Sequence, residues 1–172
     1  LNTSSAFPQR IALVHEWFSP HSSGGAENVV QAIDQLLSGL GPEPQLAALV
    51  DGESSRPGSW LYGRKIKTSF IQKLPFGINH VQSYLPLLPF AIEQLELSEF
   101  PLVISSSHLV AKGVLTSPNQ LHVSYVHTPV RYAWDQMHVY LRSSVNTKLC
   151  LGPLIRWQLH CLRQWDQLSG SR

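Results

Sequence analysis

Three polar clusters contain the residue types that bind sugars, phosphates or protons. They are residues 15–16 with the double glycine at 24–25, residues 105–108, and His127. A double glycine lets the backbone approach a ligand closely, and free N–H groups at a helix N-terminus attract anions. Hydroxyl groups beside a histidine suit a sugar or a phosphate, and an imidazole exchanges protons near neutral pH. These clusters are therefore the candidate functional site.

Each cluster also has a purely structural interpretation. Gly24 and Gly25 fit neither the GxGxxG fingerprint nor a Walker A loop, so they also suit a flexible turn. The serines at 105–107 also suit the caps of a strand-to-helix turn, and no GxSxG elbow supports a catalytic triad. An ion pair between Arg131 and Asp135 would simply hold the last loop together. Both interpretations stay open on these residues alone.

A metal site is not expected from the spacing of histidines and cysteines. The chain has eight histidines, but no two of them stand at HxH or HxxxH spacing. Cys150 and Cys161 lack a CxxC pattern, and two cysteines make no disulfide framework.

Apolar runs predict the strands that position these clusters. We expect a mainly parallel sheet that contains residues 11–15, 45–50, 102–106 and 122–127, with helices on both faces. The strand–loop–helix–strand order at the start of the chain is typical of a βαβ unit, whose strands are parallel. Open sheets of this kind bind ligands at the carboxyl ends of their strands, which is where all three clusters fall.

Helical periodicity appears on both sides of these strands. After residue 26 one helical face is predicted to carry Val29, Ile33, Leu36 and Leu40, with Glu27 favouring the dipole in the first turn. Residues 67–97 suit short helical pieces broken by prolines. Near the end, an amphipathic helix is predicted over 153–168. Its apolar stripe is Leu154, Trp157, Cys161, Trp165 and Leu168, widened by Ile155, Leu159 and Leu162.

Length and composition exclude some classes of protein. The 172 residues suit one domain at 10–172 behind a disordered leader at 1–9. The net charge of +2 argues against a nucleic-acid binder, and no apolar run reaches the roughly 18 residues of a membrane span. Charged residues are 14%, against about 25% on average, which indicates either a surface rich in Ser, Gln and His or a missing partner surface. The first residues lack a signal-peptide pattern, so we expect a cytoplasmic protein.

Several motifs together carry a family resemblance. They are IALVHEWF, GGAENVVQAI, KTSFIQKLPF, YLPLLPFAIEQLELSEFPLVISSSHLVAKGV, HVSYVHTPVRYAWDQMHVYL and LRQWDQLSGSR. Over residues 10–172 the chain resembles the N-terminal, Rossmann-like domain of a family 4 glycosyltransferase of GT-B architecture. Such enzymes move a sugar from a nucleotide-sugar donor to a glycan or lipid-linked acceptor, usually with retention of configuration, and need no metal or other cofactor.

The resemblance also implies roles for individual residues. It places Gly24 and Gly25 near the donor phosphates and makes His127 a catalytic contact to the transferred sugar. It also assigns Ser107, His108, Lys112 and Arg131 to the substrate cleft, where the acceptor binds.

The sequence departs from the family in one large respect. It lacks the second domain, which in the family binds most of the donor and carries an acidic E-x7-E-type motif. We therefore expect an acceptor-binding half that is inactive alone, completed by the missing domain or by a partner, with a homodimer as one such arrangement. The alternative is a non-catalytic module that binds a glycan or a protein partner. A third hypothesis is peripheral contact of residues 142–168 with the inner face of a membrane.

Overall fold

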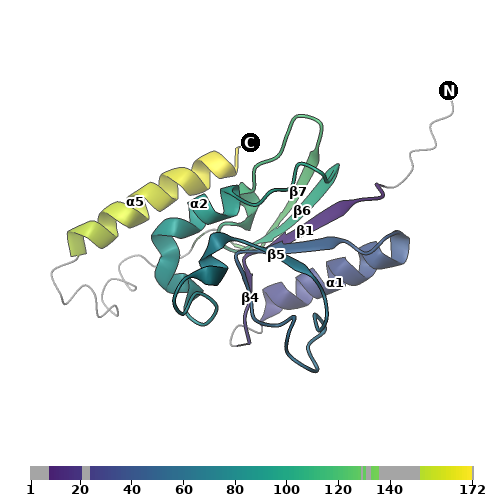
Figure 1. The fold of residues 1–172 in the computed structure, drawn as a ribbon. Helices are drawn as coiled ribbons and strands as arrows, with labels where there is room; N and C mark the ends of the chain where they lie inside the picture. Colours follow the sequence, from purple (N-terminus) through teal and green to yellow (C-terminus); the bar gives the residue numbers. More distant parts are fainter. Residues whose placement is uncertain (1–7, 21–23, 129, 131–132, 136–151, 172) are drawn as a thin grey trace.

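A five-stranded sheet forms the centre of the molecule (Figure 1). The structure is a computed structural model that describes residues 8–20, 24–128, 130, 133–135 and 152–171. The strand order is β5-β3-β1-β6-β7, and every neighbouring pair is parallel. In chain order the strands are β1 (Ile11–His15), β3 (Gln45–Ala48), β5 (Ile66–Thr68), β6 (Leu102–Ser107) and β7 (Leu121–Val126). The predicted α/β fold with a mainly parallel sheet is confirmed.

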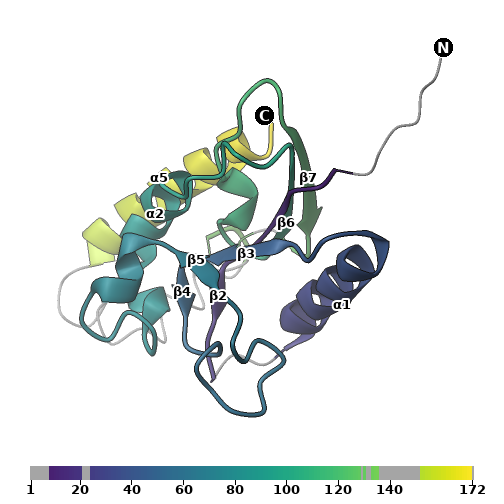
Figure 2. The ribbon, with the colours of Figure 1, turned by 45° about the vertical axis from the view of Figure 1, so that its right-hand side comes forward.

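Helices cover both faces of this sheet, as predicted. They are α1 (Gly25–Leu40), α2 (Leu88–Glu93) and α5 (Gly152–Ser169). Successive residues of β1 point to opposite faces. Ile11 packs with Leu37 of α1, whereas Ala12 belongs to the cluster that includes Ile92 of α2 and Leu159 of α5. Figure 2 shows the sheet between α1 on one side and the pair α2 and α5 on the other.

Short elements complete the chain. A second, two-stranded parallel sheet joins β2 (Trp17–Phe18) to β4 (Val50–Asp51). The 3₁₀ helices among the described residues are η1 (Phe70–Lys73), η2 (Val81–Leu87) and η3 (Ala111–Gly113). The predicted strand over 45–50 is therefore interrupted at Leu49, where the chain passes from one sheet to the other. The helical pieces predicted from residue 67 begin later, because Ile66–Thr68 is an edge strand too short to show a period.

The buried faces of the two long helices differ from the predicted stripes. In α1 the buried residues are Val30, Asp34 and Leu37, and Leu36 and Leu40 of the predicted face are exposed. The face has rotated because Asp34 pairs with the Arg64 guanidinium at 3.1 Å, a partner 30 residues away.

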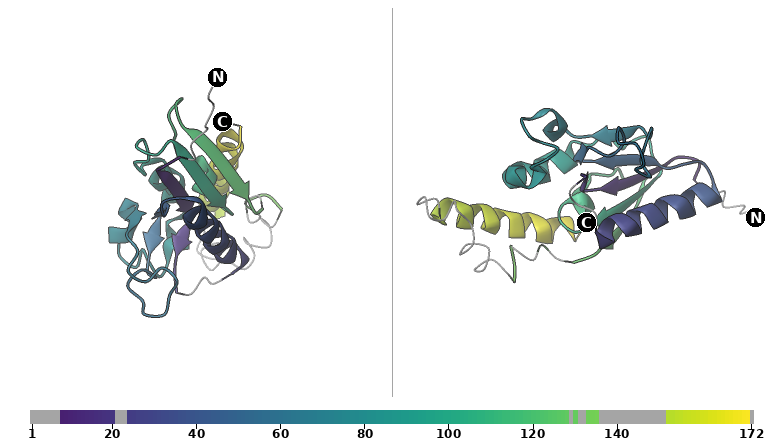
Figure 3. Two further views of the ribbon diagram at one scale, coloured as in Figure 1. Left: turned by 90° about the vertical axis from the view of Figure 1, so that its right-hand side faces the viewer. Right: turned by 90° about the horizontal axis from the view of Figure 1, so that it is seen from below.

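In α5 the predicted stripe is also displaced. The buried residues are Leu159, Leu162, Asp166 and Ser169, whereas Leu154, Trp157 and Leu168 are exposed. The buried carboxylate of Asp166 takes part in a polar network with η3, described below. The first turns of α5 extend past the other elements (Figure 3). None of the helices in the described ranges is both long and apolar enough to cross a bilayer.

Candidate functional site

Glu16 lies where the first strand leaves the main sheet. β1 ends at His15, and the chain resumes as β2 in the small second sheet. The backbone carbonyl of Glu16 accepts a hydrogen bond from the Leu49 N–H at 2.8 Å, at the matching break between β3 and β4. At this bend the Glu16 side chain is completely buried.

One oxygen of this carboxylate organises the loop after β6. Oε1 of Glu16 accepts hydrogen bonds from the Ser107 hydroxyl and from the four consecutive backbone N–H groups of residues 108–111, at 2.8–3.0 Å. Buried N–H groups that lack a partner cost free energy, so the carboxylate supplies what a helix or strand would otherwise provide. Glu16 thereby fixes the position of His108.

The second oxygen of Glu16 faces histidine rings. Nδ1 of His108 lies 3.1 Å from Oε2, and Nδ1 of His15 lies 3.5 Å from it. Burial by itself raises the pKa of Glu16, but these rings and the Ala111 N–H outweigh it and lower the pKa to about 2. Burial lowers the pKa of His108, but the Glu16 carboxylate outweighs this effect and the net shift is upward. The pair therefore favours a carboxylate beside an imidazolium.

His15 links this pair to the start of α1. Its Nδ1 donates a hydrogen bond to the Ser106 carbonyl at 3.0 Å. Nε2 lies 4.0 Å from Oε1 of Glu27 and has no hydrogen-bond partner among the described residues. The other oxygen of Glu27 accepts the Gly24 N–H at 2.9 Å. Burial raises the pKa of Glu27, but the His15 ring and backbone hydrogen bonds outweigh this effect and the net shift is downward. This carboxylate is therefore also ionised at neutral pH.

An open hollow of about 300 Å³ lies over these groups. Gly24, Gly25 and His108 line it, so the structure brings together three residues that the sequence placed in the site. A Cβ atom added at Gly25 would meet no atom within 4 Å, so this glycine leaves one wall of the hollow bare. The His108 ring stands edge-on to Trp17, with ring centroids 5.0 Å apart, and reaches solvent through the hollow.

His127 lies at the same edge of the sheet, directly after β7. Its Nε2 is 2.8 Å from the Ser106 hydroxyl, and its ring packs against Tyr125 with centroids 4.8 Å apart. Burial lowers the pKa of His127, which favours the neutral ring. Ser106 therefore connects His127 through its hydroxyl to His15 through its carbonyl.

The other predicted site residues lie elsewhere. Ser107 is buried and donates to Glu16, so its hydroxyl holds the loop in place. Nζ of Lys112 lies 2.7 Å from Oδ1 of Asp166 and borders a different hollow, of about 470 Å³, with His122 and Ser124. Arg131 lies outside the described residues.

Sequence reasoning placed Glu16 in one of the polar clusters but gave it no individual role, and it gave Glu27 only an interaction with the helix dipole. The signal for Glu16 was a carboxylate two residues after the apolar run 11–14 of a buried strand, a position where burial requires a partner. Its partners are 91 to 95 residues away, so no spacing rule reveals them. Spacing in the sequence also does not reveal a group of residues that could ligate a metal: ligand atoms of His15, Glu16 and His108 lie within 4.8 Å of one another.

The cluster offers an imidazolium, a neutral imidazole and two carboxylates around a hollow at the carboxyl edge of the sheet. Such groups suit the hydroxyl groups of a sugar and the exchange of a proton. Comparisons of the chain with protein-family models, curated proteins and solved structures found no significant match.

Proposed function

We propose that this chain is the acceptor-binding half of a glycosyltransferase that moves a hexosyl group from a nucleotide sugar, with retention of configuration. One observation carries the proposal: the Glu16 network holds His108 beside Gly24 and Gly25, in an open hollow at the carboxyl edge of a parallel sheet. Ligands of such sheets bind at this edge. The motif resemblance supplies the chemistry, and the proximity of the double glycine to His108 supports it.

Each group then has a role. His127 forms a hydrogen bond to the transferred sugar, and this bond is strongest as positive charge develops at the anomeric carbon of the sugar. The neutral ring of His127 suits this role. Gly24 and Gly25 let the donor phosphates approach the backbone. His108, beside the same hollow, binds the acceptor or a donor oxygen. Because the donor's main binding groups belong to a second domain in the family, transfer requires that domain or a partner that replaces it.

A non-catalytic binding module is the second candidate. The observation that favours it is that the Glu16 network is formed entirely by this chain, so the hollow needs no second domain to take shape. Both candidates predict ligand binding at the same place, but they differ in whether the site takes part in transfer.

The test is a transfer assay. The purified chain, and the chain joined to a nucleotide-sugar-binding domain of a GT-B enzyme, are incubated with uridine and guanosine diphosphate sugars and with glycan and lipid-linked acceptors. We expect negligible turnover by the chain alone and measurable turnover by the joined protein. His127→Ala should lower kcat of the joined protein by roughly 10²-fold, the scale of one lost transition-state hydrogen bond. Robust turnover by the chain alone, or kcat unaffected by His127→Ala, contradicts the proposal.

A further inference from the structure

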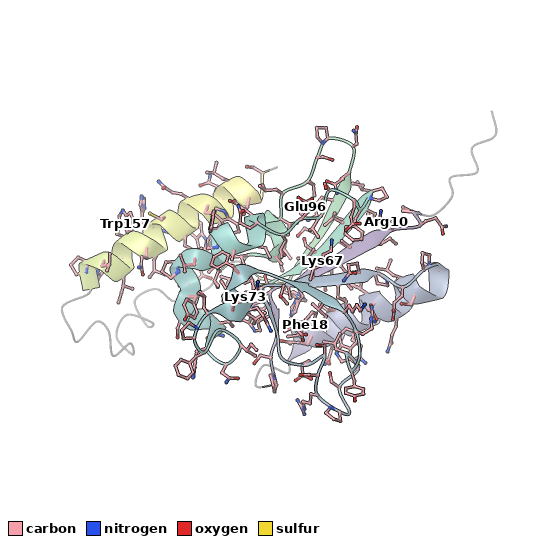
Figure 4. All side chains as sticks on the ribbon, viewed as in Figure 1. Arg10, Phe18, Lys67, Lys73, Glu96 and Trp157 are labelled. Atoms are coloured by element: carbon pink, nitrogen blue, oxygen red, sulfur yellow. The ribbon has the colours of Figure 1, made fainter. Side chains whose placement is uncertain are left out.

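An apolar groove runs between α5 and the segment formed by η2 and α2. Its volume is about 280 Å³. Within the described part of the chain, Gln158 is the one polar side chain that lines it. Trp157, on the N-terminal half of α5 (Figure 4), is 62% exposed although it borders the groove. The apolar lining includes Leu85, Pro86, Pro89, Trp157, Cys161 and Trp165.

A polar hollow lies at the other end of η2. It has a volume of about 220 Å³, and its polar lining side chains include Asn79, His80, Gln82 and Ser83. It shares Trp17 and Gln82 with the hollow beside His108, so the two hollows adjoin and are together called the depression.

The 3₁₀ helix η2 joins this depression to the groove. Gln82 and Ser83 line the polar hollow, and Leu85 and Pro86, only two or three residues further on, line the apolar groove. Two Cα atoms that are two residues apart are separated by at most about 7 Å. The polar and apolar compartments are therefore within reach of a single small ligand.

The charge of this region restricts the chemistry of such a ligand. Residues 74–92 contain no Asp, Glu, Lys or Arg. Amides and hydroxyls recognise neutral hydroxyl groups by hydrogen bonds, and an apolar groove lined by Trp and Pro excludes polar matter. Large apolar side chains also remain exposed beside η2, with Phe76 at 74% and Phe90 at 55%.

We propose that this region binds an amphiphile, with an uncharged, hydroxyl-rich headgroup in the polar hollow and one hydrocarbon chain in the groove. The inference rests on the proposed function and names the class of its acceptor. The headgroup lies next to His108, and the chain leads away from the sheet toward α5.

Alkyl β-D-glucosides with butyl, hexyl and octyl chains test the inference. Their affinity for the purified full chain is measured by titration calorimetry below their micellar concentrations. We expect the affinity to rise about fourfold per added methylene until the groove is full, because each buried methylene contributes about 0.8 kcal/mol. Trp157→Ala should weaken octyl glucoside at least tenfold and butyl glucoside little. Leu168→Ala, on the same helix and 63% exposed but outside the groove, is the matched control and should change neither.

A second variant examines the headgroup end. Gln82→Ala should weaken butyl and octyl glucoside by the same factor, about fivefold for one lost hydrogen bond. The inference is overturned if affinity is independent of chain length, or if Trp157→Ala leaves the chain-length dependence intact. It is also overturned if Trp157→Ala instead abolishes dimerisation of the chain. The same holds if Trp157→Ala abolishes binding to vesicles of anionic lipids while leaving glucoside binding unchanged. These outcomes leave the proposed transfer function standing. Conversely, if the joined protein shows no transfer but the affinity still depends on chain length, the transfer function is contradicted and the amphiphile site stands.

Discussion

At the scale of single residues, a buried carboxylate is the organising element of the site. Glu16 satisfies a hydroxyl and four backbone N–H groups with one oxygen and faces two histidines with the other. A side chain without an acceptor oxygen at this position would leave several buried donors unsatisfied, each at a cost of about 1–3 kcal/mol. The side chain is thus required for the loop that presents His108.

The pKa of Glu16 makes this dependence visible in a pH titration. The pKa is about 2 in the folded chain against an ordinary value of 4.5. A lowered carboxyl pKa stabilises the fold above the unfolded value and ceases to do so as pH falls through the folded value. We therefore expect the free energy of unfolding to fall by roughly 3 kcal/mol between pH 5 and pH 2 through this group alone.

The His108 pKa acts at the opposite end of the pH range. It is raised above 6.5, so its stabilisation is complete below 6.5 and is lost as pH rises through the folded value. Urea unfolding from pH 2 to 9 measures both limbs. Glu16→Gln should remove both components, because the Glu16 carboxylate is what raises the His108 pKa, whereas His108→Asn should remove the alkaline component and reduce the acid-side one. Parallel pH profiles for the wild type and both variants would show that the pair does not titrate with folding.

At the scale of elements, a buried ion pair attaches α5 to η3. Asp166 contacts the Lys112 ammonium with one oxygen and accepts the Trp134 indole N–H at 2.9 Å with the other. Close packing adds to this attachment, because a Cβ on Gly113 would lie 2.2 Å from the Trp165 ring. Polar pairing and steric fit therefore hold the helix that forms one wall of the apolar groove.

Removing one partner of this pair should be costly. Asp166→Ala leaves the Lys112 ammonium buried without its counter-charge, and we expect a loss of about 3 kcal/mol in urea unfolding. In the double variant with Lys112→Ala the loss should be smaller than the sum of the single losses. Gln167→Ala, at an exposed neighbouring position, is the control. If the losses of the two single variants simply add up in the double variant, the ion pair itself contributes nothing to stability.

Prediction from sequence was strongest for elements defined by one continuous run. The strands around residues 11–15, 102–106 and 122–127 were predicted to within one residue of their observed ends. The first two begin with apolar runs because they are central strands covered on both faces, whereas β7 is an edge strand whose side chains are mostly exposed. The strand Ile66–Thr68 was missed because three half-buried residues show no period. The buried faces of α1 and α5 were misassigned because Asp34 and Asp166 are buried through pairs with Arg64 and Lys112, which lie far away in the sequence.

At the scale of the whole molecule, the site depends on the register between neighbouring strands of the sheet. The register that sets His15 opposite Ser106, and Ser106 opposite Tyr125, brings three distant polar clusters to one edge. The fold class predicts that edge, and only the register identifies the partners of Glu16. The hollow beside His108 is the consequence, and its role in binding is the central claim.

One measurement tests that claim most directly: saturation-transfer NMR of methyl β-D-glucoside, galactoside and mannoside with Gly25→Leu. A Cβ atom at Gly25 would meet no atom of the fold within 4 Å, and Gly25 lines the hollow, so a larger side chain there should occupy part of it. The control is Gly39→Leu, also free of neighbours but near the far end of α1. Both variants should fold with equal or slightly higher thermal midpoints, because leucine favours a helix more than glycine by up to about 1 kcal/mol. We expect wild-type transfer signals with Gly39→Leu and at least a tenfold loss of affinity with Gly25→Leu. Undiminished binding by a folded Gly25→Leu variant would contradict the assignment of this hollow as the site.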